Sequence, residues 1–166
     1  MFNADMKKTS LQTKPYMLND GPRFKSLAAL VYIKASTEQT GGAFNLFDVI
    51  CPIGYETPLH IHYAEDVAIQ VLEGTLDIFW GDEKKQAQAG SFFFQPRGTP
   101  HGFRTTGTTS VRISYMTIPA GFDEFVILRS QSMGTPQAIV SEMGYQIEVL
   151  GPLPIQSSNV RKGESK

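Results

Sequence analysis

The chain has 166 residues, of which 41% are hydrophobic and 19% are charged. This size and composition predict one domain folded around its own core and argue against disorder. The 15 Lys and Arg residues nearly balance the 16 Asp and Glu residues, giving a net charge of −1. Nucleic acid and anionic membranes bind proteins with a clustered basic excess, so we expect neither as a partner.

Cysteine usage and the distribution of apolar residues bear on the compartment. Cys51 is the only cysteine, which excludes an intrachain disulfide and fits a reducing environment; we expect it to be inert packing. The first residues show no apolar run of the secretory type, and no stretch reaches the ~20 apolar residues of a spanning helix. We therefore expect a cytoplasmic protein.

Most of the chain shows a strand pattern. Residues 1–22 are polar and end in turn residues, so we expect an N-terminal arm there. Beyond it, short runs rich in Val, Ile, Phe and Tyr alternate with turns that contain Gly or Pro. Evenly spaced short strands of this kind are typical of a β-sandwich or closed barrel. The predicted strands are residues 27–35, 43–51, 67–72, 75–80, 91–95 and 110–118.

The pattern changes after Pro119. Apolar residues then recur at helical spacing, which predicts a helix over residues 123–131. A second short helix is predicted between Thr135, a suitable N-cap, and Gly144, a suitable C-terminal stop. A last strand is expected over residues 145–150, and the polar residues 156–166 are expected to form a tail. The domain is thus predicted to span residues 23–155.

The three histidines of the chain are candidate metal ligands. His60 and His62 are two positions apart, so on a strand their rings point to the same side. His101 follows a Pro–Gly turn at the start of another predicted strand, and it can meet the other two if the strands are neighbours. Neutral imidazole is a good ligand for divalent transition metals. Three protein ligands leave coordination positions open, as in catalytic rather than structural sites.

These segments resemble the two sequence motifs of the cupin family. The first reads Gly54, five residues, His60-Ile61-His62, and is closed by Gly74; the second reads Gly90, five residues, Pro96-Arg97-Gly98, two residues, His101. Further similarity to single-domain cupins grouped with bacterial quercetin dioxygenases extends over about four fifths of the chain. It includes residues 40–44, 71–74, 118–122 and 147–152.

The resemblance implies a fold and an activity. The expected fold is all-β, a cupin jelly-roll barrel (double-stranded β-helix) with one or two short C-terminal helices. The expected activity is that of a metal-dependent dioxygenase acting on a small organic molecule of the enol, flavonol or diketone type. The expected cofactor is one divalent ion, Fe, Mn, Ni, Co, Cu or Zn, held by His60, His62 and His101, because imidazole suits several such ions.

The chain departs from the family pattern at two positions. Cupins with a three-His, one-Glu site carry the Glu where this chain has Val67, and the usual Asn of the second motif is Thr105. In the quercetin dioxygenases that Glu also accepts the flavonol proton, which Val67 cannot do. A three-His site keeps both positive charges of the ion and is the stronger Lewis acid. The neighbouring Glu65 and Asp66 are candidates for proton handling if the loop turns one of them inward.

Other residues are candidates for the substrate pocket. Aromatic and apolar side chains on the predicted strands would form a wall suited to an aromatic or aliphatic ligand, although each taken singly is equally a core residue. Arg104 and Arg112 would suit an anionic group, with a surface position as the plainer interpretation. The predicted pocket residues are Tyr32, Phe47, Tyr55, Val67, Phe94, Phe103 and Tyr115.

Two alternatives to the dioxygenase stay open at this point. The domain can bind a small molecule without converting it, with Val67 marking the loss of catalysis. It can also catalyse a non-redox isomerisation or hydrolysis, in which the metal polarises a carbonyl. Gln70 lies mid-strand on the face away from the metal, which predicts a homodimer across that sheet.

Overall fold

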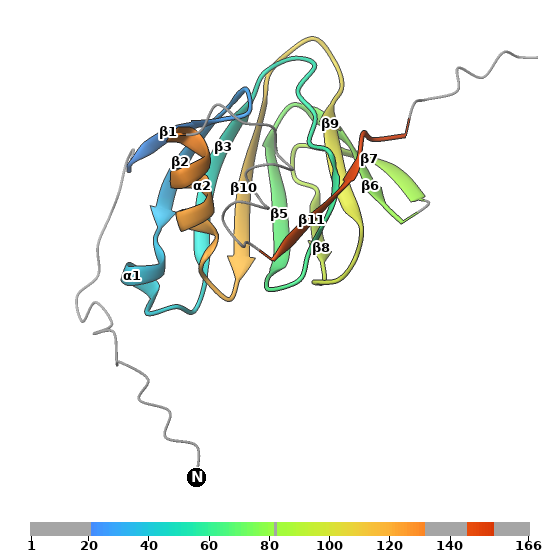
Figure 1. Cartoon of the computed structure of the whole chain (residues 1–166). Coiled ribbons are helices and arrows are strands. Elements are labelled where there is room, and N and C mark those ends of the chain that lie inside the picture. Colours follow the sequence, from blue (N-terminus) through green and yellow to red (C-terminus); the bar gives the residue numbers. More distant parts are fainter. Residues whose placement is uncertain (1–20, 82, 132–145, 155–166) are drawn as a thin grey trace, which may run out of the picture.

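Two antiparallel sheets make up most of the computed structural model, which describes residues 21–81, 83–131 and 146–154 (Figure 1). The six-stranded sheet has the order β1 (Arg23–Ser26), β2 (Ala29–Ala35), β3 (Asn45–Cys51), β10 (Val111–Ile118), β5 (Asp66–Glu73) and β8 (Phe92–Gln95). The five-stranded sheet has the order β11 (Ile147–Gly151), β4 (Leu59–His62), β9 (His101–Thr105), β6 (Thr75–Trp80) and β7 (Glu83–Gln88). The predicted all-β jelly-roll architecture is confirmed.

Strand alternation builds the core between the sheets. Along β2 and β3 every second residue is buried, so that Val31 and Ile33 face inward while Leu30 and Tyr32 face outward. The inward side chains of both sheets, among them Phe47, Leu76 and Ile113, pack into one cluster. Several members of this cluster, among them Phe47 and Ile113, also line the cavity in front of the histidines.

The strands expected from the sequence are present, with ends that differ by at most two residues. A strand that the sequence pattern missed is β7, whose Glu-Lys-Lys-Gln segment lacks apolar alternation. It lies at the edge of its sheet, where only Ala87 is buried, and charged side chains are typical of edge strands. The short strand β1 was also not predicted.

Two helices occur among the described residues. The short helix α1 (Thr37–Thr40) was not predicted, although Ser36 and Gln39 form a capping box at its start. The helix expected over residues 123–131 is α2 (Phe122–Gln131). The expected last strand is β11, whereas the second predicted helix, most of the N-terminal arm and the tail lie outside the described residues. In the part of the chain that the structure describes, no helix is long and apolar enough to cross a membrane.

Asn45 attaches α2 to the six-stranded sheet. Its side chain is fully buried, and its Oδ1 accepts hydrogen bonds from the backbone N–H groups of Gly121 (2.8 Å) and Asp123 (3.3 Å). Its Nδ2 donates to the carbonyl of Ala35 at 3.4 Å. The Asp123 carboxylate in turn accepts from the backbone N–H of Thr37 at 2.8 Å. The first turn of α2 is therefore held by buried polar contacts to β2, β3 and α1.

We predict that Asn45→Ala lowers the free energy of unfolding by about 2–4 kcal/mol, because it leaves several buried donors unsatisfied. Urea unfolding followed by circular dichroism measures this. Thr117→Val is the matched control, since it removes a single donor to the Asn45 Oδ1 (3.4 Å) with little change of shape. Equal losses in the two variants would contradict the role given to Asn45.

Candidate metal centre

The three histidines come together on two paired strands. His60 and His62 project from β4, and His101 opens β9 directly opposite His60 in the antiparallel register. One ring nitrogen from each of the three lies within 4.8 Å of the others. The ring centroids of His60 and His101 are 4.5 Å apart, and those of His62 and His101 are 5.3 Å apart. The prediction from motif spacing that His60, His62 and His101 lie together is confirmed.

Local backbone contacts hold the two strands in this register. The N–H of Gly98, in the turn before β9, donates to the carbonyl of His62 at 2.7 Å. Gly102 follows His101, and a Cβ at that position would lie 2.9 Å from the carbonyl oxygen of Pro58. Only a residue without a side chain allows β9 to approach the segment before β4 this closely.

Hydrogen bonds to the Nδ1 atoms determine which nitrogen of each ring is free. The Nδ1 of His60 lies 2.7 Å from the carbonyl oxygen of Pro58, and the Nδ1 of His101 lies 2.9 Å from that of Thr99. Because a carbonyl only accepts, both Nδ1 atoms carry the proton and both Nε2 atoms keep a lone pair. The Nε2 of His101 is buried and has no hydrogen-bond partner among the described residues.

Burial also keeps these imidazoles neutral. It is the largest cause that lowers the pKa of His101 to about 4, with the charge of His62 adding to it. Burial likewise lowers the pKa of His60 well below its usual value, helped by His101 and His62. A neutral ring with an unpaired Nε2, as in His101, is the state in which histidine binds a metal. The cluster therefore fits one divalent ion and can hold it through three nitrogen ligands.

Glu65 supports the histidines from behind. Its side chain is only 3% exposed, and its Oε2 lies 3.3 Å from the Nδ1 of His62. A carboxylate on the far nitrogen of a histidine orients the ring and increases its basicity as a ligand. Glu65 does not line the cavity, so its place is behind His62.

The structure corrects the expectation for Asp66. Its carboxylate faces away from the histidines and forms two side-chain hydrogen bonds with Arg97, at 3.1 and 3.0 Å. It also accepts from the backbone N–H of Arg97 at 2.9 Å. Glu65 lies in the loop just before β5 and contacts His62, whereas Asp66, the first residue of β5, is paired with Arg97.

The two departures from the family motif have structural roles. Val67 is fully buried in the core, where it packs among apolar residues. The Thr105 hydroxyl donates to the carbonyl of Pro52 at 3.0 Å and tightens the loop before the first motif. No acidic residue stands beside the three histidines among the described groups that can hold a metal.

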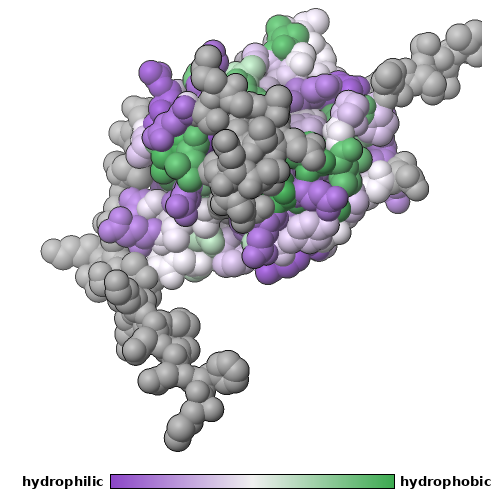
Figure 2. Space-filling model, in the orientation of Figure 1, coloured by the Kyte–Doolittle hydropathy of each residue, from purple (hydrophilic) through white to green (hydrophobic). Residues whose placement is uncertain are grey.

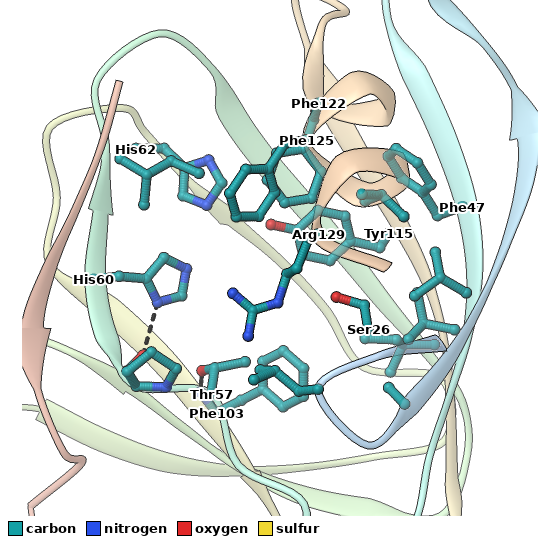
Figure 3. Close-up of a pocket in the computed structure, with 18 of the residues that line it drawn as sticks. Ser26, Phe47, Thr57, His60, His62, Phe103, Tyr115, Phe122, Phe125 and Arg129 are labelled. Atoms are coloured by element: carbon teal, nitrogen blue, oxygen red, sulfur yellow. Dashed lines mark hydrogen bonds between the residues drawn. The ribbon is translucent and has the colours of Figure 1, made fainter. Parts of the chain in front are cut away.

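An apolar cavity opens in front of the histidines. Its volume is about 120 Å³, and its wall includes residues of both sheets and of α2 (Figure 3). Four of the predicted pocket residues line it, namely Phe47, Tyr55, Phe103 and Tyr115. Burial raises the pKa of Tyr115 far above its usual value, and Glu65 adds to this, so its phenol stays protonated and can donate to a ligand.

Three predicted pocket residues do not line the cavity, and the prediction is corrected for them. Tyr32 is on the outward face of β2, and Phe94 is 52% exposed on β8, where Phe93 packs on the core instead. Both errors are of strand parity, since a shift of one residue reverses the face. Val67 faces inward but packs within the core, outside the cavity wall.

Helix α2 supplies pocket residues that the sequence interpretation missed. Phe122 contacts the His62 ring at a centroid distance of 5.2 Å, and Phe125 and Arg129 also line the cavity. The signal was present, because positions 122, 125, 126 and 129 form one helical face that carries an arginine among apolar residues. Arg104 and Arg112, the candidates for an anionic group, are instead paired on the surface with Glu56 (2.7 Å) and Asp48 (2.7 Å).

Comparison with known proteins agrees with the fold and the site. Residues 47–118 match the family model described as "Cupin domain". Together with the jelly-roll fold, this match shows that the chain contains a cupin domain, and one protein of similar sequence is a quercetin dioxygenase.

That relative is quercetin 2,3-dioxygenase of Bacillus subtilis, which is 28% identical over 103 residues; the match covers 61% of this chain but only 31% of the Bacillus protein. A protein of Methanocaldococcus jannaschii described as uncharacterized is 27% identical over 106 residues, covering 64% of this chain and 80% of its own length. Among solved structures, that of KdgF from Halomonas sp. has a TM-score of 0.57 at 21% identity and covers 68% of this chain and 99% of that one. The structural likeness concerns the fold.

We predict that Glu65→Gln weakens metal binding about 10- to 100-fold, because the carboxylate that orients His62 is lost. Asp66→Asn is the matched control on the neighbouring residue, and it should leave the metal affinity unchanged. Competition with a chromophoric chelator measures both affinities. Equal weakening in the two variants would contradict the positions assigned to Glu65 and Asp66.

Proposed function

We propose that this cupin is a metal-dependent oxidoreductase, a dioxygenase that acts on a small organic molecule. The observation that carries the proposal is the cluster of three imidazoles, two of them with Nδ1 atoms hydrogen-bonded to backbone carbonyls, facing an apolar cavity. The sequence relationship to a quercetin dioxygenase supports the same reaction class. Because the match covers only 31% of that enzyme, its substrate cannot be carried over to this chain. We therefore infer the substrate from the cavity.

His60, His62 and His101 would hold one divalent ion, with Fe, Mn, Ni, Co, Cu and Zn all compatible with imidazole ligands. Such an ion supplies Lewis acidity and, if it is redox-active, a route for electrons to O2. Three neutral ligands leave its charge uncompensated, which favours an anionic oxygen of the substrate over a neutral one. The phenol of Tyr115 is a donor within the same cavity.

Cavity size favours a small enol or diketone over a complete flavonol. A cavity of roughly 150 Å³ holds one benzene molecule, and the cavity here measures about 120 Å³. The enclosed space is thus of the order of a single ring or a short chain, and the fused and pendant rings of a flavonol would have to extend through its open side. Val67 in place of a carboxylate points the same way, because none of the described residues that line the cavity is an acid that could accept a flavonol proton.

Glu65 keeps a role in the proposed reaction, but it acts through His62 and does not contact the substrate. Its carboxylate contacts His62 and lies outside the cavity wall, so it acts through the orientation and basicity of that ring. Asp66 has no part in the reaction proposed here, because Arg97 occupies its carboxylate.

The test combines metal content with oxygen consumption. We expect about one equivalent of metal in the parent protein. We expect none in His60→Ala or His101→Ala, because the two imidazoles that remain in each variant are too few to hold the ion. The parent protein, loaded in turn with each candidate ion, should consume O2 with at least one member of a panel of small 1,3-diketones, cyclic enols and flavonols. His101→Ala is the matched control and should show no uptake.

Each other outcome assigns a different function. Substrate conversion that continues without O2 would replace the dioxygenase with a metal-dependent isomerase or hydrolase. Ligands that raise the melting temperature and are recovered unchanged would make the domain a binding module. Absence of metal even after reconstitution would overturn the metal centre itself.

The homodimer remains a prediction, as does the cytoplasmic location. Gln70 is exposed on the outer face of β5, opposite Phe92 of the neighbouring β8, which is 65% exposed. Exposed apolar side chains around Gln70 favour association of this face with a second copy. Light scattering at micromolar concentration should give the mass of a dimer, and Phe92→Asp should shift it to that of a monomer. A monomeric mass for the parent protein would contradict the prediction.

A further inference from the structure

Arg129 brings a positive charge into the apolar cavity. It lies on the inward face of α2, is only 8% exposed, and lines the same cavity as the three histidines. Figure 3 shows its guanidinium extending into the space between His60 and Ser26. Hydrophobic groups gather in several patches on the outside of the molecule as well (Figure 2), but there they lie among hydrophilic residues. The cavity instead surrounds one charged group with apolar walls.

The described part of the chain provides no counter-charge for Arg129. Arg97, Arg104 and Arg112 each form an ion pair with a carboxylate. No ion pair or hydrogen bond joins the Arg129 guanidinium to a described residue, and no Asp or Glu is among the residues that line the cavity. Burial lowers the pKa of Arg129, but guanidinium remains protonated in proteins. An unpaired buried charge costs several kcal/mol, which a bound anion would recover.

The geometry of the helix keeps this charge in place. The first turn of α2 is tied to Asn45 through the backbone of Gly121 and Asp123, and Phe122 packs on the His62 ring. Arg129 lies seven residues further along and thus on the same face. The cavity therefore has a metal-ligand cluster at one side and a fixed guanidinium at the other, with apolar residues between them.

We propose that Arg129 binds the carboxylate of the ligand, and that the natural ligand is a small organic acid with one ring or a short aliphatic body. The planar guanidinium fork matches a carboxylate in a two-bond contact. The apolar walls suit the hydrocarbon body, and about 120 Å³ limits its size. A small carboxylic acid is thus the substrate class of the proposed dioxygenase. Binding of the acid by Arg129 does not depend on that function, whereas its conversion does. Arg129 lies beyond residue 118, where the match to the cupin family model ends.

The experiment compares carboxylates with their own amides. Benzoate, phenylacetate and hexanoate are titrated into the full-length protein beside benzamide, phenylacetamide and hexanamide, by calorimetry and by thermal melting. The metal-free protein is used first, and then the Zn(II)-loaded protein, so that binding to Arg129 is separated from binding to an ion. We expect at least one carboxylate to bind about tenfold or more tightly than its amide in both forms.

Arg129→Met should bind carboxylate and amide equally well, and it should still bind the metal. Arg112→Met is the matched control, because it removes an arginine from the outer face of β10, and it should leave the preference unchanged. Arg129→Lys keeps the charge without the fork and should retain only part of the preference. Without ligand, Arg129→Met should melt at a higher temperature than the parent, because a buried unpaired charge is removed.

Two results would overturn the proposal. The first is a parent protein that binds no carboxylate more tightly than its amide. The second is a preference that persists in Arg129→Met. A parent protein that binds no metal but keeps the Arg129-dependent preference would overturn the proposed function and leave this inference standing.

Discussion

The pairing of β4 with β9 is the constraint on which the site depends. His60 and His101 are opposite one another in this antiparallel register, and strand alternation then brings His62 to the same side. A slip of one residue would turn the whole histidine set outward. The contact from Gly98 to the His62 carbonyl and the absence of a side chain at Gly102 both act on this register. Residues of both motifs other than the histidines therefore hold the three imidazoles in place.

Glu65, the acidic residue nearest this pairing, supports the ring of His62. Val67 fills the core where related cupins carry a carboxylate ligand, and Glu65 reaches the Nδ1 of His62 from the far side. The negative charge thus lies on the outer side of one imidazole and faces away from the cavity. The cavity therefore has the positive charge of Arg129 on one wall and the three histidines on another. An anionic ligand would balance that charge within the cavity.

The sequence was most informative where a local rule applied. Motif spacing and strand parity were enough to bring His60, His62 and His101 together, and turn residues were enough to separate most strands. Parity failed for Tyr32 and Phe94, because an apolar residue on an outer face looks the same in sequence as one on an inner face. The role of Arg129 depends on where α2 packs, which is a long-range contact through Asn45. Helical periodicity placed Arg129 on the apolar face of α2, but it did not show that this face lines the cavity.

The attachment of α2 by its first turn separates two properties of the protein that could evolve independently. Asn45 and Asp123 hold the helix through polar contacts that do not involve the cavity-facing side chains of its later turn. Substitutions along that face would alter which molecule fits, while the histidines, contributed by β4 and β9, stay as they are. Selection could therefore change the preferred ligand through one helix and leave the histidine cluster of the five-stranded sheet undisturbed.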